Sequence, residues 1–259
     1  MRIAVLTADE PLYLPAFFDR FLARRAADVA GIFACEPIYK RQTKFSMFRR
    51  YVQAFGLRSA LDLAWRVAEA KAKDRLQIGL AQRRFHSVAA AAAYYRVPVE
   101  YPKDVNAPEF LTRLRELGVD VILSVSCPQV FREDLIRLPA LGCLNLHGAD
   151  LPNYRGILPS FWMLAHGETQ AAVTIFFVDA RVDTGDAAGR RVFPILPDDT
   201  LESLILRSKQ EACDLALETL DRIQAGTVER RPLQGEGSYF GFPTRAGYRE
   251  FRRRGRRLR

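Results

Sequence analysis

VDVILSVSCPQVFREDLIRLPALGCLNLH, residues 119–147, contains the pattern that decides the fold. Its first eight residues form a nearly continuous apolar run, which is typical of a strand buried in a parallel sheet. Pro128 opens a segment to residue 138 that suits a helix, because proline is favoured in a first helical turn. Residues 143–147 are the next strand, so the stretch predicts a strand–helix–strand unit.

The same alternation of short apolar runs and helical stretches extends to both sides. Further strands are expected at residues 2–7, 28–35, 97–101 and 172–179. Helices are expected at residues 14–26, 88–96, 108–118, 159–167 and 200–225. Ser87 and Thr200 suit the starts of two of these helices, and Gly118 suits the end of a third. The alternation predicts an α/β fold, with an open, mostly parallel sheet and helices on both faces.

The composition limits the classes of protein that are possible. The chain has 259 residues, of which 49% are hydrophobic and 27% charged, as in an ordinary globular protein. No apolar run reaches the roughly 18 residues that a membrane span needs. The opening MRIAVLTADEPLYLP has too short an apolar run for a signal peptide, so we expect a cytoplasmic protein.

The four cysteines are widely scattered and form no Cys-x-x-Cys pair. They are Cys35, Cys127, Cys143 and Cys213. This spacing argues against a metal site or a set of disulfides, and it favours small core residues in a reducing compartment.

The net charge of +9 is concentrated in two segments. Residues 40–84 hold twelve Lys or Arg against three acids, and residues 245–259 hold eight Arg against one Glu. The rest of the chain is therefore acidic overall. We expect a basic helical insertion at about 40–84 and a short C-terminal extension with an Arg-rich end.

Within the basic insertion, apolar side chains recur at helical spacing. They are Phe45, Phe48, Val52, Phe55, Leu57, Leu61, Trp65 and Ala68. One interpretation is that one or two amphipathic helices pack on the domain and leave a basic face in solvent, and this is our expectation. The alternative is a surface for phosphate, a membrane or a partner protein.

His147, one of only three histidines, lies where a predicted buried strand opens into a loop rich in Pro and Gly. Asn145 is two residues earlier, so both side chains point to the same face at the end of the strand. Ligands bind at this edge of such sheets. A second strand ends in VDARVDTGD, residues 178–186, so Asp183 is expected to approach His147 across the strand ends.

An amide, an imidazole and a carboxylate at one point suit acyl transfer to an amine. Asn145 would stabilise the oxyanion as it develops, and His147 would add a second donor or move a proton. Asp183 would hold and charge the imidazole, or help to accept the proton of the amine. No Ser or Cys nucleophile is needed if the amine attacks the acyl donor directly.

Other kinds of site fit these residues less well. Aspartic proteases also contain Asp-Thr-Gly, but they are all-β and need two such aspartates. A metal site needs several ligands at suitable spacing, whereas His86 and His166 lie at expected helix ends. A dinucleotide site needs Gly-x-Gly-x-x-Gly after the first strand, where residues 6–15, LTADEPLYLP, hold no glycine.

Residues 142–186, GCLNLHGADLPNYRGILPSFWMLAHGETQAAVTIFFVDARVDTGD, resemble the folate-dependent formyltransferases. That family shares a strand-borne Asn-x-His, a loop of the type Leu-Pro-x-Tyr-Arg-Gly and a downstream Asp-x-x-x-Asp-Thr-Gly-Asp. The similarity extends over about residues 105–195. The resemblance implies a Rossmann-like catalytic domain over residues 1–226, which includes the insertion, and leaves residues 227–259 as an extension.

The resemblance also implies a formyl donor, 10-formyltetrahydrofolate, and gives Asn145, His147 and Asp183 the catalytic roles described above. It places the folate between two segments and largely on backbone groups. The residues concerned are Ser126, Cys127, Pro128, Gln129 and Val130 on one side, and Asp179 and Asp183 on the other. Two departures from the family pattern, Asp150 and Ala187 where apolar Leu and Ile are usual, leave the acceptor side open.

Members of that family formylate methionyl-tRNA, glycinamide ribonucleotide, nucleotide-linked amino sugars or hydroxylated amino acids. The tRNA enzymes carry a C-terminal β-barrel, for which residues 227–259 are too few, and the first loop lacks the glycines expected for glycinamide ribonucleotide. We therefore expect a small amine, an amino sugar on a nucleotide, contacted by Tyr154 and Arg155. A structural salt bridge is the other role considered for Arg155. Methionyl-tRNA is the alternative acceptor, and a non-catalytic module acting through the basic segments is the alternative function.

The extension has an aromatic part and a basic part. SYFGFPT, residues 238–244, is expected to tuck back on the domain. Residues 249–259 hold seven arginines and one acid, so they form either a polyanion-binding arm or a solvated terminus. For a small acceptor, truncation after Tyr248 is expected to leave the activity within a few-fold.

Overall fold

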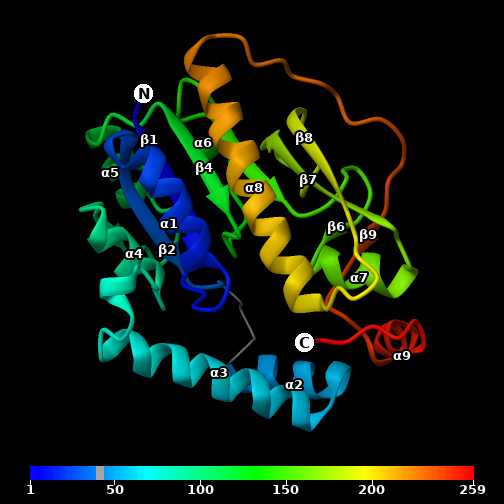
Figure 1. Cartoon of the computed structure of the whole chain (residues 1–259). Helices are drawn as coiled ribbons and strands as arrows, with labels where there is room; N and C mark the ends of the chain where they lie inside the picture. Colours follow the sequence, from blue (N-terminus) through cyan, green and yellow to red (C-terminus); the bar gives the residue numbers. More distant parts are fainter. Residues whose placement is uncertain (39–43) are drawn as a thin grey trace.

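The computed structural model describes residues 1–38 and 44–259, and it contains an open, twisted seven-stranded sheet (Figure 1). The strands lie in the order β3-β2-β1-β4-β5-β7-β8. Their bounds are Val99–Glu100, Val29–Cys35, Ile3–Ala8, Val121–Val125, Cys143–His147, Gln170–Phe177 and Ala187–Pro194. All pairs from β3 to β5 are parallel, and β7 is antiparallel to both β5 and β8. The predicted mostly parallel α/β sheet is confirmed.

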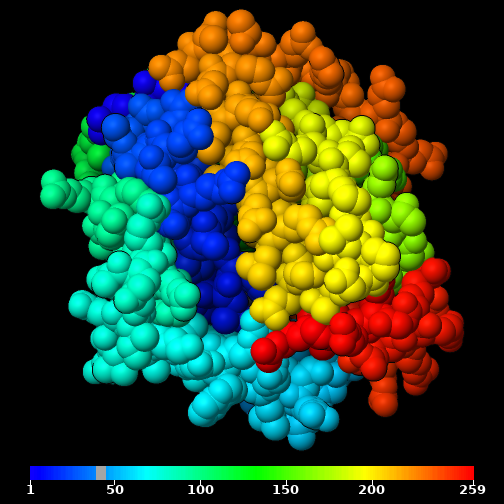
Figure 2. All heavy atoms as spheres, viewed as in Figure 1, coloured from blue at the N-terminus to red at the C-terminus, as the bar shows by residue number. Residues whose placement is uncertain are grey.

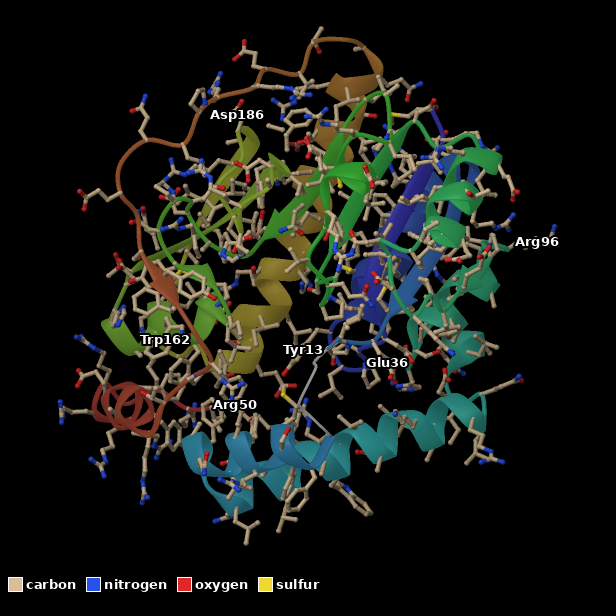
Figure 3. The ribbon with its side chains drawn as sticks, turned by 180° about the vertical axis from the view of Figure 1, so that it is seen from behind. Tyr13, Glu36, Arg50, Arg96, Trp162 and Asp186 are labelled. Carbon is tan, nitrogen blue, oxygen red and sulfur yellow. The ribbon has the colours of Figure 1, made fainter. Side chains whose placement is uncertain are left out.

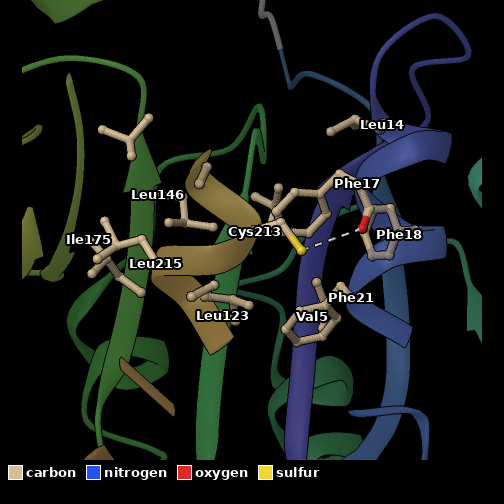
Figure 4. Packing of buried hydrophobic residues seen from close by; sticks show 14 of the residues in the cluster. Val5, Leu14, Phe17, Phe18, Phe21, Leu123, Leu146, Ile175, Cys213 and Leu215 are labelled. Atoms are coloured by element: carbon tan, nitrogen blue, oxygen red, sulfur yellow. Dashed lines mark hydrogen bonds between the residues drawn. The ribbon is translucent and has the colours of Figure 1, made fainter. Parts of the chain in front are cut away.

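Helices cover both faces of the sheet, as predicted. One face carries α1 (Leu14–Arg25), α8 (Leu201–Gln224) and, against α1, α4 (Val88–Tyr94). The other carries α5 (Pro108–Glu116) and the short α6 (Glu133–Ile136). Figure 4 shows how the first layer forms: side chains of α1 and α8 interdigitate over the apolar side chains that the strands present, such as Val5, Leu123 and Ile175.

The caps expected from the sequence are present. Ser87 accepts a hydrogen bond from the backbone N–H of Ala90 at the start of α4. Thr200 and Ser203 form a reciprocal capping box at the start of α8. Gly118 has a φ of +61° just after α5, a conformation that glycine adopts without strain. These local signals explain why the predicted ends of the helices agree closely with the structure.

The helix expected at residues 128–138 is wrong over its first half. Only Glu133–Ile136 is helical, and residues 126–132 form a loop. The reason is the Gln129 side chain, which donates to the carbonyls of Glu36 and Lys103 and accepts from the N–H of Val105. Three hydrogen bonds to other segments hold this stretch in a non-helical path.

The basic insertion forms α2 (Lys44–Phe55) and α3 (Leu57–Arg75), joined at Gly56, followed by the 3₁₀ turn η2 (Leu80–Gln82). The expected helices are confirmed, but the expectation that their large apolar side chains pack on the domain is wrong for most of them. Phe55 is buried, whereas Phe45, Leu57, Leu61 and Trp65 are exposed. Small residues form much of the inward face of α3, so the large ones point outward; residues 40–43 lie outside the described part.

The C-terminal extension is docked on the domain. β9 (Tyr239–Phe240) pairs in parallel with β6 (Arg155–Gly156), which confirms that the aromatic segment tucks back. The last helix, α9 (Arg245–Arg253), packs on α7 (Pro159–His166) through the fully buried Phe251. In Figure 2 this C-terminal segment lies against the rest of the molecule beside α2.

The expectation that residues 249–259 form a solvated terminus is wrong, because their backbone is docked on the domain. Polyanion binding by the exposed arginines of this segment stays a prediction. Arg254 donates to the carbonyl of Ala165, and Arg256 donates to the carbonyls of Leu196 and Pro197. The backbone carbonyls of Arg257 and Leu258 accept hydrogen bonds from the first two N–H groups of α8. The tail therefore helps to cap α8, and its backbone is part of the fold.

Within residues 1–38 and 44–259, no helix is long and apolar enough to cross a membrane.

Candidate active site

The predicted catalytic residues meet at the carboxyl edge of the sheet. Asn145 and His147 are the third and last residues of β5, and Asp183 lies in the loop that joins β7 to β8. β4 is parallel to β5, but β7 is antiparallel to it, so the carboxyl end of β7 lies beside the start of β5. The expectation that Asp183 approaches His147 across adjacent strand ends is therefore wrong in its reason: the loop after β7 folds back along β5 to bring Asp183 to His147. His147 is buried and Asp183 is mostly buried, with side chains 9% and 11% exposed.

The two nitrogens of the His147 ring have different surroundings. Nε2 lies 2.8 Å from the carbonyl oxygen of Tyr154, and since a carbonyl can only accept, Nε2 carries a hydrogen. In the neutral ring this leaves Nδ1 with a free lone pair. Nδ1 lies 3.8 Å from Oδ2 of Asp183. The geometry therefore provides a base at Nδ1, with a carboxylate placed to attract the imidazolium that forms when it takes a proton.

Asp183 also holds the loop that leads from β5 to α7. Its Oδ2 accepts a hydrogen bond of 3.1 Å from the backbone N–H of Gly156. Gly156 has a φ of +98°, and a Cβ there would lie 2.3 Å from the carbonyl oxygen of Phe240 on β9. The carboxylate thus connects the histidine, the Tyr-Arg-Gly loop and, through β6, the C-terminal extension.

The loop before β8 is shaped by its own residues. Asp179 accepts hydrogen bonds from the hydroxyl of Thr184 and the backbone N–H of Arg181. A Cβ on Gly185 would lie 1.7 Å from the carbonyl oxygen of Phe177, so only glycine fits this position. The Asp-Thr-Gly sequence therefore fixes the loop in a conformation that places the carboxylate of Asp183 close to His147.

Asn145 is only partly buried, although it lies inside a strand. It is in register with Ser124 on β4 and Phe176 on β7. Its side-chain amide makes no hydrogen bond to another residue in the described part of the chain, and it is free to donate to a ligand.

Left-handed backbone conformations are concentrated around these residues. Ser126, Tyr154, Leu158 and Asp183 all have φ between +54° and +59°. Such conformations cost on the order of 1 kcal/mol or more for residues other than glycine, and they cluster at functional sites. This observation is independent of the side-chain geometry and points to the same edge of the sheet.

The residues expected to bind the folate differ in whether their side chains are already hydrogen-bonded within the protein. The side chain of Gln129 is fully used in the hydrogen bonds to Glu36, Lys103 and Val105, and the carboxylate of Asp179 is used inside its own loop. Neither side chain is available to a ligand without losing these bonds. Val130 is exposed. Contact through backbone groups of residues 126–130 therefore stays a prediction.

Besides Asp183, three positions of that set remain, and they directly follow the end of β4. Ser126 accepts a hydrogen bond through its hydroxyl, Cys127 is partly buried and lies beside the thiol of Cys35, and Pro128 has no backbone N–H to offer. Hydrogen bonding to Cys35 is the main reason that the pKa of the Cys127 thiol is lowered.

The two residues expected to contact the acceptor point to different surroundings. The hydroxyl of Tyr154 donates to Oε1 of Glu168 at 2.7 Å, and its ring stacks on Phe240. Burial, and secondly the bond to Glu168, raise the pKa of this phenol. Tyr154 thus uses its carbonyl to orient His147 and its ring to anchor β9. Contact of Tyr154 with an acceptor stays a prediction.

Arg155 lacks the structural salt bridge that was the other role considered. It forms no ion pair within the described part of the chain, and its buried Nε has no hydrogen-bond partner there. A buried donor without a partner costs about 1–3 kcal/mol, which favours a ligand that would satisfy it. The two departures from the family pattern lie elsewhere: Asp150 pairs with Arg190, and Ala187 bridges to Arg231 on the extension.

Sequence reasoning missed two residues at this edge. Thr174 lies opposite His147 on β7, donates to the carbonyl of Ala149 and accepts from the N–H of Leu151, so it fixes the start of the loop. The hydroxyl of Thr174, inside an otherwise apolar predicted strand, could have indicated this role.

Lys209 is the other missed residue, and nothing in the sequence of α8 distinguishes it from a solvated lysine. Its Nζ donates to Oγ of Ser126 at 2.6 Å, beside the end of β4. Desolvation lowers the pKa of Lys209 to about 8, and the nearby carboxylate of Glu10 opposes this. Burial in turn raises the pKa of Glu10, against hydrogen bonds from three backbone N–H groups.

The cluster as a whole can perform proton transfer beside a polarised carbonyl. Asn145 offers a neutral donor, His147 a base, and Asp183 a countercharge; the first two lie on the central strand β5, and the third lies in the loop after β7. This set suits attack by an amine on an acyl carbon, where negative charge develops on oxygen and a proton must leave nitrogen.

Comparison with known proteins shows similarity both in sequence and in fold. A sequence model described as Formyl transferase matches residues 1–220. The chain is 39% identical over 143 residues to a methionyl-tRNA formyltransferase of Geobacter metallireducens, a segment that covers 55% of this chain and 46% of the relative. The chain thus spans about half the length of the curated relatives it matches.

Solved structures share the fold. A phosphoribosylglycinamide formyltransferase of Anaplasma phagocytophilum superposes with a TM-score of 0.62 at 15% identity, covering 93% of this chain and 98% of that one. An N-formyltransferase of Helicobacter canadensis, solved with folinic acid and dTDP-3-aminofucose, superposes with a TM-score of 0.59 at 15% identity, covering 93% and 71%.

Proposed function

Because the chain belongs to the formyl transferase family, we propose that it transfers a formyl group from 10-formyltetrahydrofolate to a primary amine of a small acceptor. The observation that carries the proposal is the buried pair of His147 and Asp183, 3.8 Å apart, beside the free amide of Asn145. All three belong to the matched part of the chain.

In the proposed reaction the amine attacks the formyl carbon directly. Asn145 donates a hydrogen bond to the formyl oxygen as negative charge develops there. Nδ1 of His147 accepts the proton that the amine loses, and the carboxylate of Asp183 stabilises the resulting imidazolium. The proton is then available for N10 of the departing tetrahydrofolate, so the enzyme returns to its starting state.

We place the folate between residues 126–130 and the loop at 179–185. Backbone groups would carry most of the contact, since the side chains of Gln129 and Asp179 are already bonded within the protein. The left-handed backbone at Ser126 and Asp183, one on each side, supports two loops shaped for a ligand.

A nucleotide-linked amino sugar is the acceptor we favour. Two cationic groups near the catalytic edge, Arg155 and Lys209, would suit its phosphates, and Arg155 has an unsatisfied buried donor. The N-formyltransferase of Helicobacter canadensis, which shares the fold, was solved with such a compound. Methionyl-tRNA is the second candidate, because the curated relatives with 35–39% identity are methionyl-tRNA formyltransferases.

The proposal is tested by measuring tetrahydrofolate release with a panel of amines. The panel holds dTDP- and UDP-linked amino sugars, glycinamide ribonucleotide and methionyl-tRNA, with 10-formyltetrahydrofolate as the donor. We expect saturable turnover with an amino sugar nucleotide. Turnover with methionyl-tRNA alone would move the acceptor to RNA. Absence of turnover, with folate binding intact, would favour a non-catalytic module.

Arg155→Ala is expected to raise the KM for the acceptor about 10-fold or more and to leave the KM for the folate unchanged. A charge-assisted contact with a phosphate is worth roughly 1.5–3 kcal/mol, and the alanine variant loses it. Arg24→Ala, at an exposed position of α1, is the matched control. Equal increases in both KM values would show that Arg155 acts on the loop and not on the acceptor.

Lys209 gives the acceptor KM a pH dependence. Its pKa of about 8 means that the amine is charged below this pH and neutral above it. If the ammonium contacts an acceptor phosphate, the KM rises as the pH passes from 7 to 9. Lys209→Gln should show a high KM that stays flat over this range, whereas Lys71→Gln, on exposed α3, should behave as the wild type. A persistent rise in the Lys209→Gln variant would assign the effect to another group.

A further inference from the structure

Helices α2 and α3 expose a stripe of large apolar side chains. Phe45 is 74% exposed, Trp65 72%, Leu57 56% and Leu61 55%. On α3 the spacing is regular, since Leu57, Leu61 and Trp65 are four residues apart and lie on one side of the helix. Single apolar residues on a surface are common, but a regular row of three on one side of α3, with a second exposed ring on the adjoining α2, marks an interaction surface.

The opposite side of the same helices is packed on the domain. Phe55 is buried against Phe161, Phe242 and Tyr248, and Ala60 and Ala70 are the buried residues of α3. Two ion pairs tie α3 to the rest of the protein, Arg66 with Glu202 and Arg259 with Asp62. The helices therefore form a fixed platform whose exposed stripe is not needed for their own packing.

Unpaired cations surround the stripe. Four of them form no ion pair within the described part of the chain: Arg49, Arg58, Lys71 and Arg75. Arg50 faces the domain instead, with its guanidinium over the ring of Phe242. The three acids of α3 are all engaged, Asp62 with Arg259, Glu69 with Lys73 and Asp74 with the hydroxyl of Ser87. The surface is thus apolar along its middle and positive at its edges, without internal compensation.

We propose that the exposed face of α2 and α3 docks on an anionic lipid surface. Aromatic and Leu side chains on one side of a helix and Arg and Lys at its margins are the composition of helices that lie in a membrane interface. The apolar stripe would enter the headgroup boundary, and each cation near the surface would gain from the anionic lipids. This inference does not depend on the acceptor proposed above.

The charges argue against two other occupants. A second copy of this chain would bring the same four cations face to face, and like charges across an interface oppose association. Single-stranded nucleic acid would suit the arginines and the rings, but Leu57 and Leu61 offer no flat face on which a base can stack. An anionic bilayer satisfies both the charges and the aliphatic side chains.

The exposed face of α2 and α3 lies on one particular side of the protein relative to the sheet. Figure 3 shows Tyr13 and Glu36, which follow β1 and β2, close above α3, so these helices lie beyond the carboxyl edge of the sheet. In Figure 2 they form the lower rim of the molecule. A bilayer under α3 would therefore lie on the side of the protein toward which β1 and β2 run.

The test uses the full chain and vesicles of phosphatidylcholine, alone or mixed with phosphatidylglycerol. In a flotation assay we expect binding to the mixed vesicles, at least 10-fold weaker binding to phosphatidylcholine alone, and a fall with added salt. Trp65→Ser combined with Phe45→Ser should lose the binding. Leu141→Ser, which removes an exposed apolar side chain before β5 at the other edge of the sheet, should retain it.

Trp65 also reports on insertion. Its fluorescence should shift to shorter wavelength on mixed vesicles and be quenched by brominated lipid, and both changes should vanish in Trp65→Phe. Circular dichroism of each variant checks that the fold is kept. No flotation, or flotation that persists in the double variant, would overturn the proposal. So would a concentration-dependent dimer, or RNA binding, that is lost in the double variant while vesicles are not bound.

Discussion

Replacing His147 by alanine, or Asp183 by asparagine, is expected to lower kcat by about 10²-fold or more. The first change removes the base whose Nδ1 faces the carboxylate. The second keeps an oxygen that can accept from Gly156 but removes the charge that stabilises the imidazolium. The folate affinity should change little in either variant. Steady-state kinetics, with folate binding measured by fluorescence, gives both quantities.

The double variant sharpens this prediction. Because Asp183 acts through His147, the loss in the double variant should be close to that of His147→Ala alone, and not the product of the two. His86→Ala, in the segment between α3 and α4, is the control and should keep normal turnover. Near-normal kcat in His147→Ala would show that the proton leaves by another route.

Phe251→Ala is expected to lower the free energy of unfolding by about 3–5 kcal/mol, the usual cost of removing a fully buried phenylalanine. Its ring is 0% exposed, stacks on Phe161 at 5.2 Å between centroids and joins α9 to α7. Urea denaturation measures the loss. Arg252→Ala, an exposed neighbour on the same helix, should change the stability by about 0.5 kcal/mol or less.

The buried position of Phe251 changes the result expected from a truncation after Tyr248. On the sequence alone, such a truncation was expected to leave the activity within a few-fold. It would remove Phe251 and the carbonyls of Arg257 and Leu258 that cap α8, so its main effect would be on folding. Substitution of Arg249 and Arg252 by Gln, with Phe251 kept, separates charge from fold. Unchanged stability in Phe251→Ala would mean that the tail is not part of the core.

The strands and most helices could be predicted because their signals are local. Apolar runs, Ser87, Thr200 and Gly118 are each read within a few residues of the element they define. The loop at 126–132 could not be predicted, because it depends on hydrogen bonds between the Gln129 side chain and two segments that are distant in the sequence, at Glu36 and at residues 103–105. The outward orientation of the α2–α3 stripe was missed because periodicity shows that a helix has an apolar side, not which side faces the protein.

The candidate site also contains residues that local sequence patterns predict and contacts that they do not. The shared face of Asn145 and His147 follows from strand periodicity. The reason expected for the approach of Asp183, adjacent strand ends, is wrong: β7 is antiparallel to β5, and the loop after β7 folds back to place the carboxylate 3.8 Å from His147. Lys209 on α8 contacts Ser126, which lies 83 residues earlier in the chain, and no pattern in the sequence of α8 indicates this contact. The role of the Tyr154 carbonyl in holding the histidine is a backbone contact, which side-chain identity cannot reveal.

The central claim, formyl transfer to a small amine by the His147 cluster, is tested most directly by following the formyl carbon itself. The protein is incubated with 10-formyltetrahydrofolate labelled with ¹³C in the formyl group, together with nucleotide-linked amino sugars and methionyl-tRNA in competition, and the products are identified by mass spectrometry. We expect a labelled formamide on an amino sugar nucleotide, one tetrahydrofolate for each formamide, and no label with His147→Ala. Label on methionyl-tRNA alone, or label on the sugar that persists with His147→Ala, would contradict the account.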